Sequence, residues 1–305
     1  MADLSVRIGA LKLKNPVMVA SGTFGYAEEF KGLCDLKKLG AIVTKTITIR
    51  PRQGNPVPRT CETPSGLINS IGLENPGIEG FLSEKLPVVR QFGVPVIVSI
   101  ASEEDPDEFA VLAKRLDRVP GVSALELNIS CPNLKKKRLV AQDARSTAAV
   151  VKTVRRVTGK TLIVKLSPNV TDIAEIALAA QNAGSDALAL INTVQAMAID
   201  VKTRTPRIAM GIGGLSGPAV RPIAVRMVWE VYNKVGIPIV GMGGIMDTNS
   251  ALEFFIAGAT AVSIGTANFI EPGIANEIIT GIKKYLTDNK ISSIQEFTGM
   301  MACKT

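Results

Sequence analysis

The chain alternates between short apolar runs and longer stretches in which apolar and polar residues mix with a helical period. The apolar runs are rich in β-branched residues and hardly alternate with polar ones, which is typical of parallel strands buried on both faces. Each run therefore predicts a strand. The eight runs are residues 16–21, 41–47, 95–101, 124–130, 162–168, 187–193, 237–244 and 261–267.

Most of the intervening stretches have the spacing of amphipathic helices, and several end in glycine, a common helix stop. Eight β/α units within about 250 residues favour an α/β fold of the (β/α)8 TIM-barrel type, as one domain over residues 1–305. A doubly wound open sheet is the alternative. It is disfavoured because no GxGxxG motif follows the first predicted strand. The clearest helical stretches are residues 107–119, 144–159, 172–184, 219–236 and 250–259.

Two segments rich in Pro, Gly and polar residues interrupt this alternation, residues 48–92 after the second predicted strand and residues 194–218 after the sixth. Loops that follow barrel strands lie at the C-terminal face, where active sites are built. Long ordered loops in a compact domain usually act as lids or binding loops. We therefore expect both insertions to border an active site; insertions without a function are the alternative.

The amino-acid composition excludes several kinds of catalytic and metal site. The 305 residues include no histidine, which excludes Ser-His-Asp and Cys-His catalysis and histidine-ligated metals. The four cysteines, Cys34, Cys61, Cys131 and Cys303, form no CxxC pair, so we expect no metal site and reduced thiols in a cytoplasmic protein. The N-terminal residues lack the apolar core of a signal peptide, and no apolar run is long enough to span a membrane.

The charge balance has several interpretations. Lys and Arg number 35 and Asp and Glu 27, a net charge of +8. A solvated basic surface, an anionic small ligand, an acidic protein partner or nucleic acid would each account for it. Aromatic residues make up only 4% of the chain, which leaves few platforms on which bases could stack. We therefore expect no nucleic-acid partner.

Glycines lie at the ends of two predicted strands, and lysines lie within two others. Glycines follow the seventh strand (Gly241, Gly243, Gly244) and the eighth (Gly265), the usual place of a barrel phosphate site, where bare backbone approaches the anion. Tight turns are the alternative explanation. Lys45 and Lys165 interrupt apolar strands, where lysine is seldom buried without a partner. Either they face an anionic ligand, such as a carboxylate or a reduced flavin, or they extend to the rim.

Four asparagines follow the second, fourth and sixth strands: Asn69, Asn128, Asn133 and Asn192. Each alone is an ordinary turn residue. Together, amides that both donate and accept would suit a pyrimidine-like ring. Cys131 lies just after the fourth strand, in NISCPN, where a thiol above a bound ligand could take a proton from a carbon next to a carbonyl.

The chain resembles the class 1 dihydroorotate dehydrogenases, and within them the catalytic subunits of class 1B. The motifs that carry the resemblance span nearly the whole chain and follow one another in the order that the family has. The motifs that carry it are ASGTFGY (20–26), TKTIT (44–48), GNPVPR (54–59), SGLINSIGLENPG (65–77), NISCPN (128–133), VKLSPN (164–169), LINT (190–193), GGLSGP (213–218), GMGGI (241–245) and GTANF (265–269).

This resemblance implies a barrel with one FMN that oxidises (S)-dihydroorotate to orotate in pyrimidine synthesis. It implies that Cys131 is the base at C5, that Lys45 contacts substrate and flavin, and that Lys165 stabilises the reduced flavin. The implied FMN contacts are Ser21, Lys45, Thr46, Ser99, Asn128, Lys165, Ile191, Gly217, Gly243, Gly244, Gly265 and Thr266. The implied orotate contacts are Lys45, Asn69, Ser70, Ile71, Gly72, Leu73, Asn128, Asn133, Asn192 and Thr193.

The resemblance also implies a second subunit that carries FAD and a 2Fe–2S cluster and passes electrons to NAD⁺, in a heterotetramer built on a dimer of this chain. One departure is the segment after the CPN motif, LKKKRLVAQDARST (134–147), where the family has a glycine-bearing loop. Without glycine, a loop that opens for substrate should be stiffer. Its basic run is most simply solvated surface; steering of the anionic substrate or contact with an acidic partner are the alternatives.

Three other functions are compatible with parts of the pattern. A class 1A enzyme would use fumarate without a partner subunit. An RNA-modifying FMN barrel, such as a tRNA-dihydrouridine synthase, would account for the positive charge, but the short segment after the eighth unit leaves little room for an RNA-binding domain. A barrel without activity is disfavoured by the polar residues and glycines at the strand ends.

Overall fold

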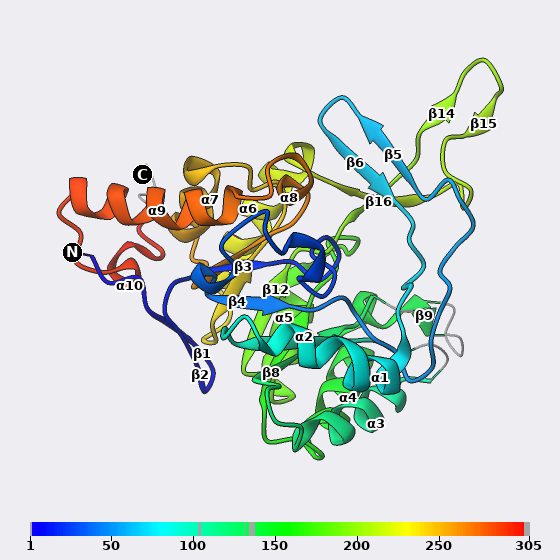
Figure 1. Cartoon of the computed structure of the whole chain (residues 1–305), viewed down its shortest axis with the longest axis horizontal. Helices are drawn as coiled ribbons and strands as arrows, with labels where there is room; N and C mark the ends of the chain where they lie inside the picture. Colours follow the sequence, from blue (N-terminus) through cyan, green and yellow to red (C-terminus); the bar gives the residue numbers. More distant parts are fainter. Residues whose placement is uncertain (1, 103–104, 131, 134–137, 302–305) are drawn as a thin grey trace.

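The computed structural model describes residues 2–102, 105–130, 132–133 and 138–301, and its centre is a closed barrel of eight parallel strands (Figure 1). β18 pairs with β3 in parallel, with Val262 opposite Val17, so the sheet closes on itself. All eight predicted strands and the barrel are confirmed, and the open-sheet alternative is wrong. In chain order the strands are β3 (Val17–Val19), β4 (Ala41–Val43), β7 (Val96–Ile100), β8 (Ala124–Asn128), β11 (Thr161–Lys165), β12 (Ala187–Leu190), β17 (Ile239–Gly241) and β18 (Ala261–Ile264).

Helices surround the barrel and confirm the five predicted ones. These are α3 (Glu108–Asp117), α4 (Ala144–Arg155), α5 (Ile173–Asn182), α6 (Arg221–Tyr232) and α7 (Thr248–Ile256). Aspartates cap several of them, as at α7, where the Asp247 carboxylate accepts the Ser250 N–H (2.7 Å) in a capping box. The short helices are η1 (Glu28–Phe30), η2 (Leu36–Lys38), η4 (Val140–Gln142), η5 (Pro218–Val220), α8 (Ala267–Ile270) and α10 (Ile294–Phe297).

Besides the short helices, two longer helical segments were not predicted. A continuous segment of α1 (Gly77–Gly80), η3 (Phe81–Lys85) and α2 (Leu86–Arg90) lies inside the predicted insertion 48–92, so this insertion is shorter than expected. The other is α9 (Ile274–Asp288), which buries Ile274, Ile278, Ile282 and Leu286. That spacing of four is an ordinary helical pattern. Only η1 and η2 lie between β3 and β4, so the first unit of the barrel lacks a full helix.

The two insertions pair with each other. β5 (Thr60–Thr63) and β6 (Gly66–Asn69) from the first insertion join β13 (Val194–Ala196) and β16 (Gly213–Ser216) from the second in one antiparallel sheet of order β13-β16-β6-β5. Figure 1 shows this sheet at one end of the barrel, with the hairpin of β14 (Ile199–Asp200) and β15 (Thr205–Pro206) projecting beyond it. The insertions thus lie at the C-terminal face, as predicted.

The opposite end of the barrel is covered by the N-terminal hairpin of β1 (Val6–Ile8) and β2 (Leu11–Leu13). Its turn contacts the start of β11, where the Ala10 N–H donates to Thr161 Oγ1 (3.2 Å). A small strand pair, β9 (Pro132–Asn133) and β10 (Arg138–Leu139), follows β8.

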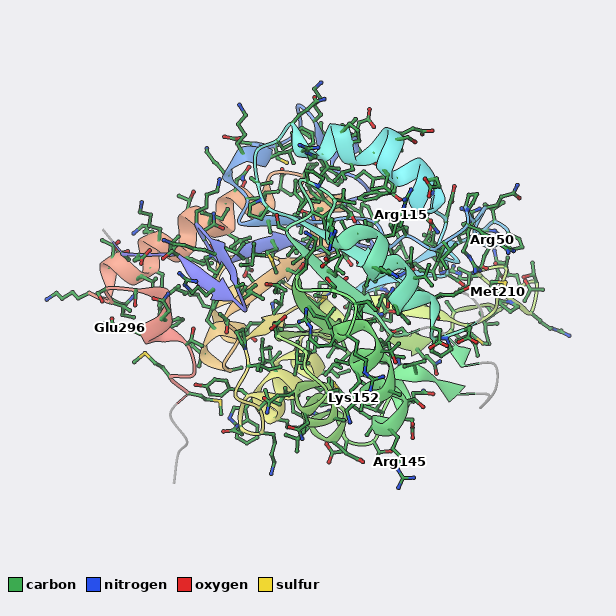
Figure 2. The ribbon with its side chains drawn as sticks, turned by 90° about the horizontal axis from the view of Figure 1, so that it is seen from below. Arg50, Arg115, Arg145, Lys152, Met210 and Glu296 are labelled. Carbon is green, nitrogen blue, oxygen red and sulfur yellow. The ribbon has the colours of Figure 1, made fainter. Side chains whose placement is uncertain are left out.

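Part of the positive charge lies on the outer surface. Arg115 on α3 and Arg145 and Lys152 on α4 are exposed on the helices around the barrel (Figure 2). In the part of the chain that is described, no helix combines the length and the apolar character needed to cross a lipid bilayer.

Candidate active site

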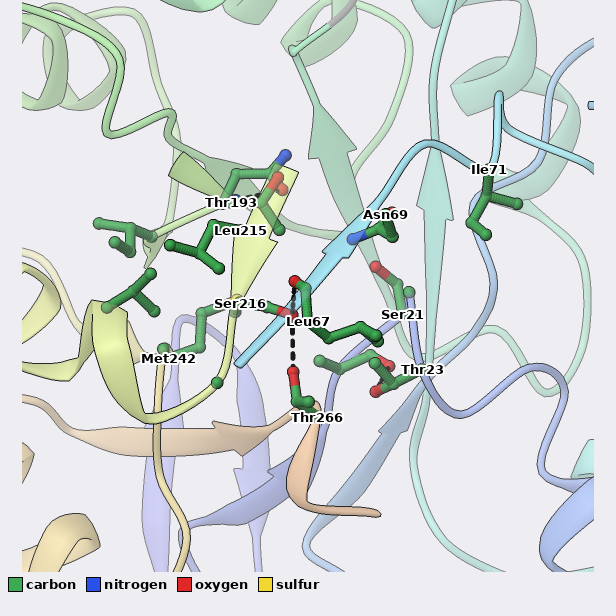
Figure 3. Close-up of a pocket in the computed structure, with 18 of the residues that line it drawn as sticks. Ser21, Thr23, Leu67, Asn69, Ile71, Thr193, Leu215, Ser216, Met242 and Thr266 are labelled. Atoms are coloured by element: carbon green, nitrogen blue, oxygen red, sulfur yellow. Dashed lines mark hydrogen bonds between the residues drawn. The ribbon is translucent and has the colours of Figure 1, made fainter. Parts of the chain in front are cut away.

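A cavity of about 480 Å³ lies at the C-terminal ends of the barrel strands, beneath the sheet of the two insertions (Figure 3). Its volume is within the range of small-molecule and cofactor sites. Side chains from β6 and β16 form one wall, and residues at or just beyond the ends of β3, β4, β8, β11, β12, β17 and β18 form the others. The cavity is therefore built partly by the barrel and partly by the insertions.

Most of the predicted site residues line this cavity. It brings together Ser21, Lys45, Thr46, Asn69, Ser70, Ile71, Gly72, Leu73, Asn128, Lys165, Ile191, Asn192, Thr193, Gly217, Gly243, Gly244, Gly265 and Thr266.

Three of the predicted site residues are not among those that line the cavity. Ser99 is not among the lining residues; it is fully buried, and its Oγ forms a hydrogen bond with Thr46 Oγ1 (2.9 Å), so it supports the wall rather than forming it. Cys131 lies outside the described residues. Asn133 belongs to β9, but its side chain also lies outside what the structure describes.

Two lysine ammonium groups share the cavity. Lys165 is the last residue of β11 and only 7% exposed, and Lys45 lies just beyond β4. Burial lowers the pKa of Lys45; the Glu74 carboxylate opposes this shift, and the Lys165 ammonium adds to it. Within the described chain, neither ammonium makes an ion pair or hydrogen bond. A buried and a half-buried cation, neither of which makes an ion pair, fit an anionic ligand.

Bare backbone faces the cavity after β17 and β18. Gly243 and Gly244 have φ of 128° and 72°, a region that L-residues rarely adopt. A Cβ on Gly244 would lie 2.7 Å from the Gly217 carbonyl oxygen. A Cβ on Gly265, in contrast, would meet only Ala20 Cβ at 3.9 Å. The space next to Gly265 is thus open to a ligand, as a phosphate site requires.

A hydrogen bond fixes the insertion sheet to this end of the barrel. Thr266 Oγ1 donates to Ser216 Oγ (2.8 Å), joining the segment after β18 to β16 (Figure 3). Ser216 in turn donates to the Leu67 carbonyl on β6 (3.3 Å). The glycine-lined end of the cavity and its insertion wall therefore hold a defined relative position.

Asparagine amides meet on another wall. Asn192 Nδ2 donates to Asn128 Oδ1 (3.3 Å) and to Ser130 Oγ (2.8 Å). Asn69 is placed on the insertion sheet, where its Nδ2 donates to the Gly214 carbonyl (3.2 Å). Three of the four asparagines thus line one cavity, and the hydrogen bonds determine how their amides are oriented.

The structure adds lining residues that sequence reasoning missed. Asn55 holds the Ser70 loop, since its Nδ2 donates to the Ser70 carbonyl (3.1 Å) and Oγ (2.9 Å). Arg52 Nε donates to the Gly72 carbonyl (3.4 Å). Several of the missed residues stand in the family-like motifs, which could have identified them. Lining residues not predicted include Thr23, Arg52, Asn55, Thr60, Leu67, Ser130, Leu215, Ser216, Met242, Ser263 and Phe269.

Comparison with known proteins agrees with this geometry. The family model described as dihydroorotate dehydrogenase matches residues 3–286. The chain belongs to the dihydroorotate dehydrogenase family. Among its relatives in this family, a protein of Geotalea daltonii is 53% identical over 300 residues, which cover 98% of each chain. One of Desulforudis audaxviator is 55% identical over 296 residues, 97% of this chain and 96% of the relative.

A third relative, from Geobacter sulfurreducens, is 52% identical over 300 residues, 98% of each chain. All three relatives carry the name dihydroorotate dehydrogenase B (NAD⁺), catalytic subunit. Dihydroorotate dehydrogenase membership favours a redox enzyme over the RNA-modifying barrel and over a barrel without activity.

Proposed function

We propose that this chain is the catalytic subunit of an NAD⁺-linked dihydroorotate dehydrogenase, which oxidises dihydroorotate to orotate in pyrimidine synthesis. The observation that carries this proposal is the shared cavity, in which the buried Lys165, the half-buried Lys45, three asparagines and glycine backbone meet. Membership of the dihydroorotate dehydrogenase family supports it, and so do the names of the relatives.

The residues present fit FMN. Gly243, Gly244, Gly265 and Thr266 line the end of the cavity that suits its phosphate, because backbone N–H groups bind anions and the space beside Gly265 is open. Lys165 suits the end of the flavin ring that gains negative charge on reduction. When bound, FMN supplies the acceptor for the hydride of the substrate. The other proposed contacts are Ser21, Lys45, Thr46, Asn128, Ile191 and Gly217, with Ser99 acting through Thr46.

The substrate would lie between the flavin and the insertion sheet. Lys45 supplies positive charge for the carboxylate of the substrate, and the amides of Asn69, Asn128 and Asn192 supply donors and acceptors for its ring. Ser70, Ile71, Gly72, Leu73 and Thr193 complete the proposed pocket, with Asn133.

Cys131 is the proposed base. As a thiolate it takes the proton from C5, while the hydride leaves C6, so that a C5=C6 double bond forms and the substrate loses two electrons. A thiol is suited to this role in a chain without histidine, because its ordinary pKa is nearer to neutrality than that of lysine or tyrosine.

The remaining parts of the proposal concern the assembly. We place the protein in the cytoplasm, as a single-domain chain that dimerises and binds a subunit with FAD and a 2Fe–2S cluster, which delivers electrons to NAD⁺. The relatives are named catalytic subunits, which supports a separate partner.

Flavin reduction by the substrate tests the proposal. The purified chain is expected to carry FMN, with its flavin absorbance, and anaerobic dihydroorotate should bleach it. A colourless protein that takes up no FMN contradicts the proposal. Sustained turnover with fumarate and no partner subunit would instead assign the class 1A reaction.

A further inference from the structure

A carboxyl group lies inside the barrel below the cavity. Glu126 is in the middle of β8 and only 2% exposed. Residues two apart in a strand share a face, so Glu126 points to the same side as Asn128, which lines the cavity. In the register of the barrel, Glu126 is opposite Ser99 on β7 and Ile163 on β11. It therefore belongs to the layer of interior residues beneath the proposed active site.

This carboxyl group has no local partner to account for its burial. Its Oε1 is enclosed and has no hydrogen-bond partner in the structure. No ion pair of Glu126 is present among the described residues. Burying an isolated carboxylate is costly unless opposite charge is near. Its place in the interior therefore needs an explanation that the proposed reaction has not supplied.

Positive charge lies one layer above it. Lys165 is two residues beyond Ile163, on the strand next to Glu126, and faces the same interior. Strand spacing and rise place the two Cα atoms roughly 8 Å apart. Lys45 interacts electrostatically with Lys165 in the same cavity. Two like charges in one poorly solvated site repel each other, and a carboxylate beneath them offsets that repulsion.

A carboxylate that acts on Lys45 lies at the rim. Glu74 interacts with Lys45, but its side chain is 53% exposed and forms an ion pair with Arg59. Solvent and this partner both weaken its effect on the cavity. Glu126 is shielded from solvent and has no such ion-pair partner among the described residues, which makes it the internal source of negative charge.

We propose that Glu126 is an ionised counter-charge of the Lys45–Lys165 pair and sets the positive potential that the cavity presents to anions. It is a positioning residue, because it acts through the lysines. This inference rests on the proposed function only in the choice of orotate as the probe. The carboxylate lowers the positive potential of the cavity and so limits how tightly the site holds an anionic product.

The test compares orotate binding by calorimetry at pH 7 in the full chain with FMN bound. Glu126→Gln keeps the shape and removes the charge, so the orotate Kd should fall about tenfold. Glu126→Asp keeps the charge and should restore a Kd near that of the wild type. Glu79→Gln makes the same change in net charge on α1, at an exposed ion pair with Arg115, and should leave the Kd unchanged.

A Kd within twofold of the wild type in a folded Glu126→Gln protein would overturn the inference. So would equal weakening of binding by the Gln and Asp variants, which would show a packing role. If Glu126→Gln fails to fold, infrared difference spectroscopy of the wild type against Glu126→Asp decides: an ionised carboxylate supports the inference and a protonated acid refutes it. Failure of the wild type to bind orotate would count against the proposed function alone, since the infrared result is independent of it.

Discussion

Replacing Gly265 by alanine separates folding from cofactor binding. The backbone of Gly265 is not in the left-handed region, and a Cβ there would meet only Ala20 Cβ at 3.9 Å, an ordinary contact. The folded protein therefore has room for the methyl group. Alanine also restricts the unfolded chain, so the free energy of unfolding of the protein without FMN should stay the same or rise by about 0.4–1 kcal/mol.

The same methyl group should weaken FMN binding. Gly265 lines the cavity at the end proposed for the phosphate, where an anion bound to backbone N–H groups would occupy the open space. An added methyl group in a close contact costs about 1–3 kcal/mol. That corresponds to a rise in the FMN Kd of roughly 5- to 150-fold.

The assay has two parts, FMN titration of the apoprotein and thermal unfolding without FMN. Gly236→Ala is the matched control, since a Cβ at Gly236 meets nothing within 4 Å and the residue lies outside the cavity lining. Gly243→Ala should instead lower stability itself, because its φ is 128° and its Cβ would lie 2.9 Å from Ala224 Cβ. Unchanged FMN affinity in Gly265→Ala would refute the placement of the phosphate.

Three further predictions concern the base, a lysine and a helix cap. Cys131→Ser should slow flavin reduction greatly and leave orotate binding nearly intact. The acid limb of the pH–rate profile for flavin reduction should also change, because the chain has no histidine that could titrate there. An unchanged acid limb would exclude Cys131 as the base. Lys165→Ala should weaken FMN retention or slow reduction, and wild-type stopped-flow traces would rule out its role. Asp247→Ala should cost about 1 kcal/mol in urea unfolding. The backbone N–H of Ser250 holds the Asp247 pKa below its usual 3.8, so this stabilisation is present above that value and lost as pH falls through the lower pKa of the folded state. A variant effect that persists unchanged in strong acid would contradict that assignment.

Much of the barrel was predictable because its strands are buried on both faces. Burial on both faces requires nearly unbroken apolar runs. Helices such as α4 can be predicted from their hydrophobic period and from a capping residue, here Asp143. The segment Gly77–Arg90 was missed because the Pro, Gly and Asn content of the preceding residues obscured where the insertion ends. α9 was within reach of the same pattern analysis, since its buried positions recur every four residues.

The site was predictable as a set of residues but not as an arrangement. Strand ends meet at one face of any such barrel, so the positions of Lys45, Asn128 and Lys165 in the sequence sufficed to bring them together. Ser99 shows the limit of this reasoning, because only the hydrogen bond to Thr46 reveals that it lies behind the wall. Local sequence contains no information on which of two neighbouring polar side chains faces the cavity.

The sequence by itself determined the eight-strand barrel, the face on which a site forms and the chemical types of its residues. The reason is that the hydrophobic period is a local property and that the order of strands and helices along the chain follows directly from it. Only the tertiary structure decided that two insertions more than a hundred residues apart pair as one sheet, with Gly214 opposite Asn69, and so close the cavity. It also decided that Glu126 lies opposite Ile163, one layer below Lys165. Both depend on contacts between distant segments, whose register is set by packing and closure of the whole barrel rather than by any one stretch of chain.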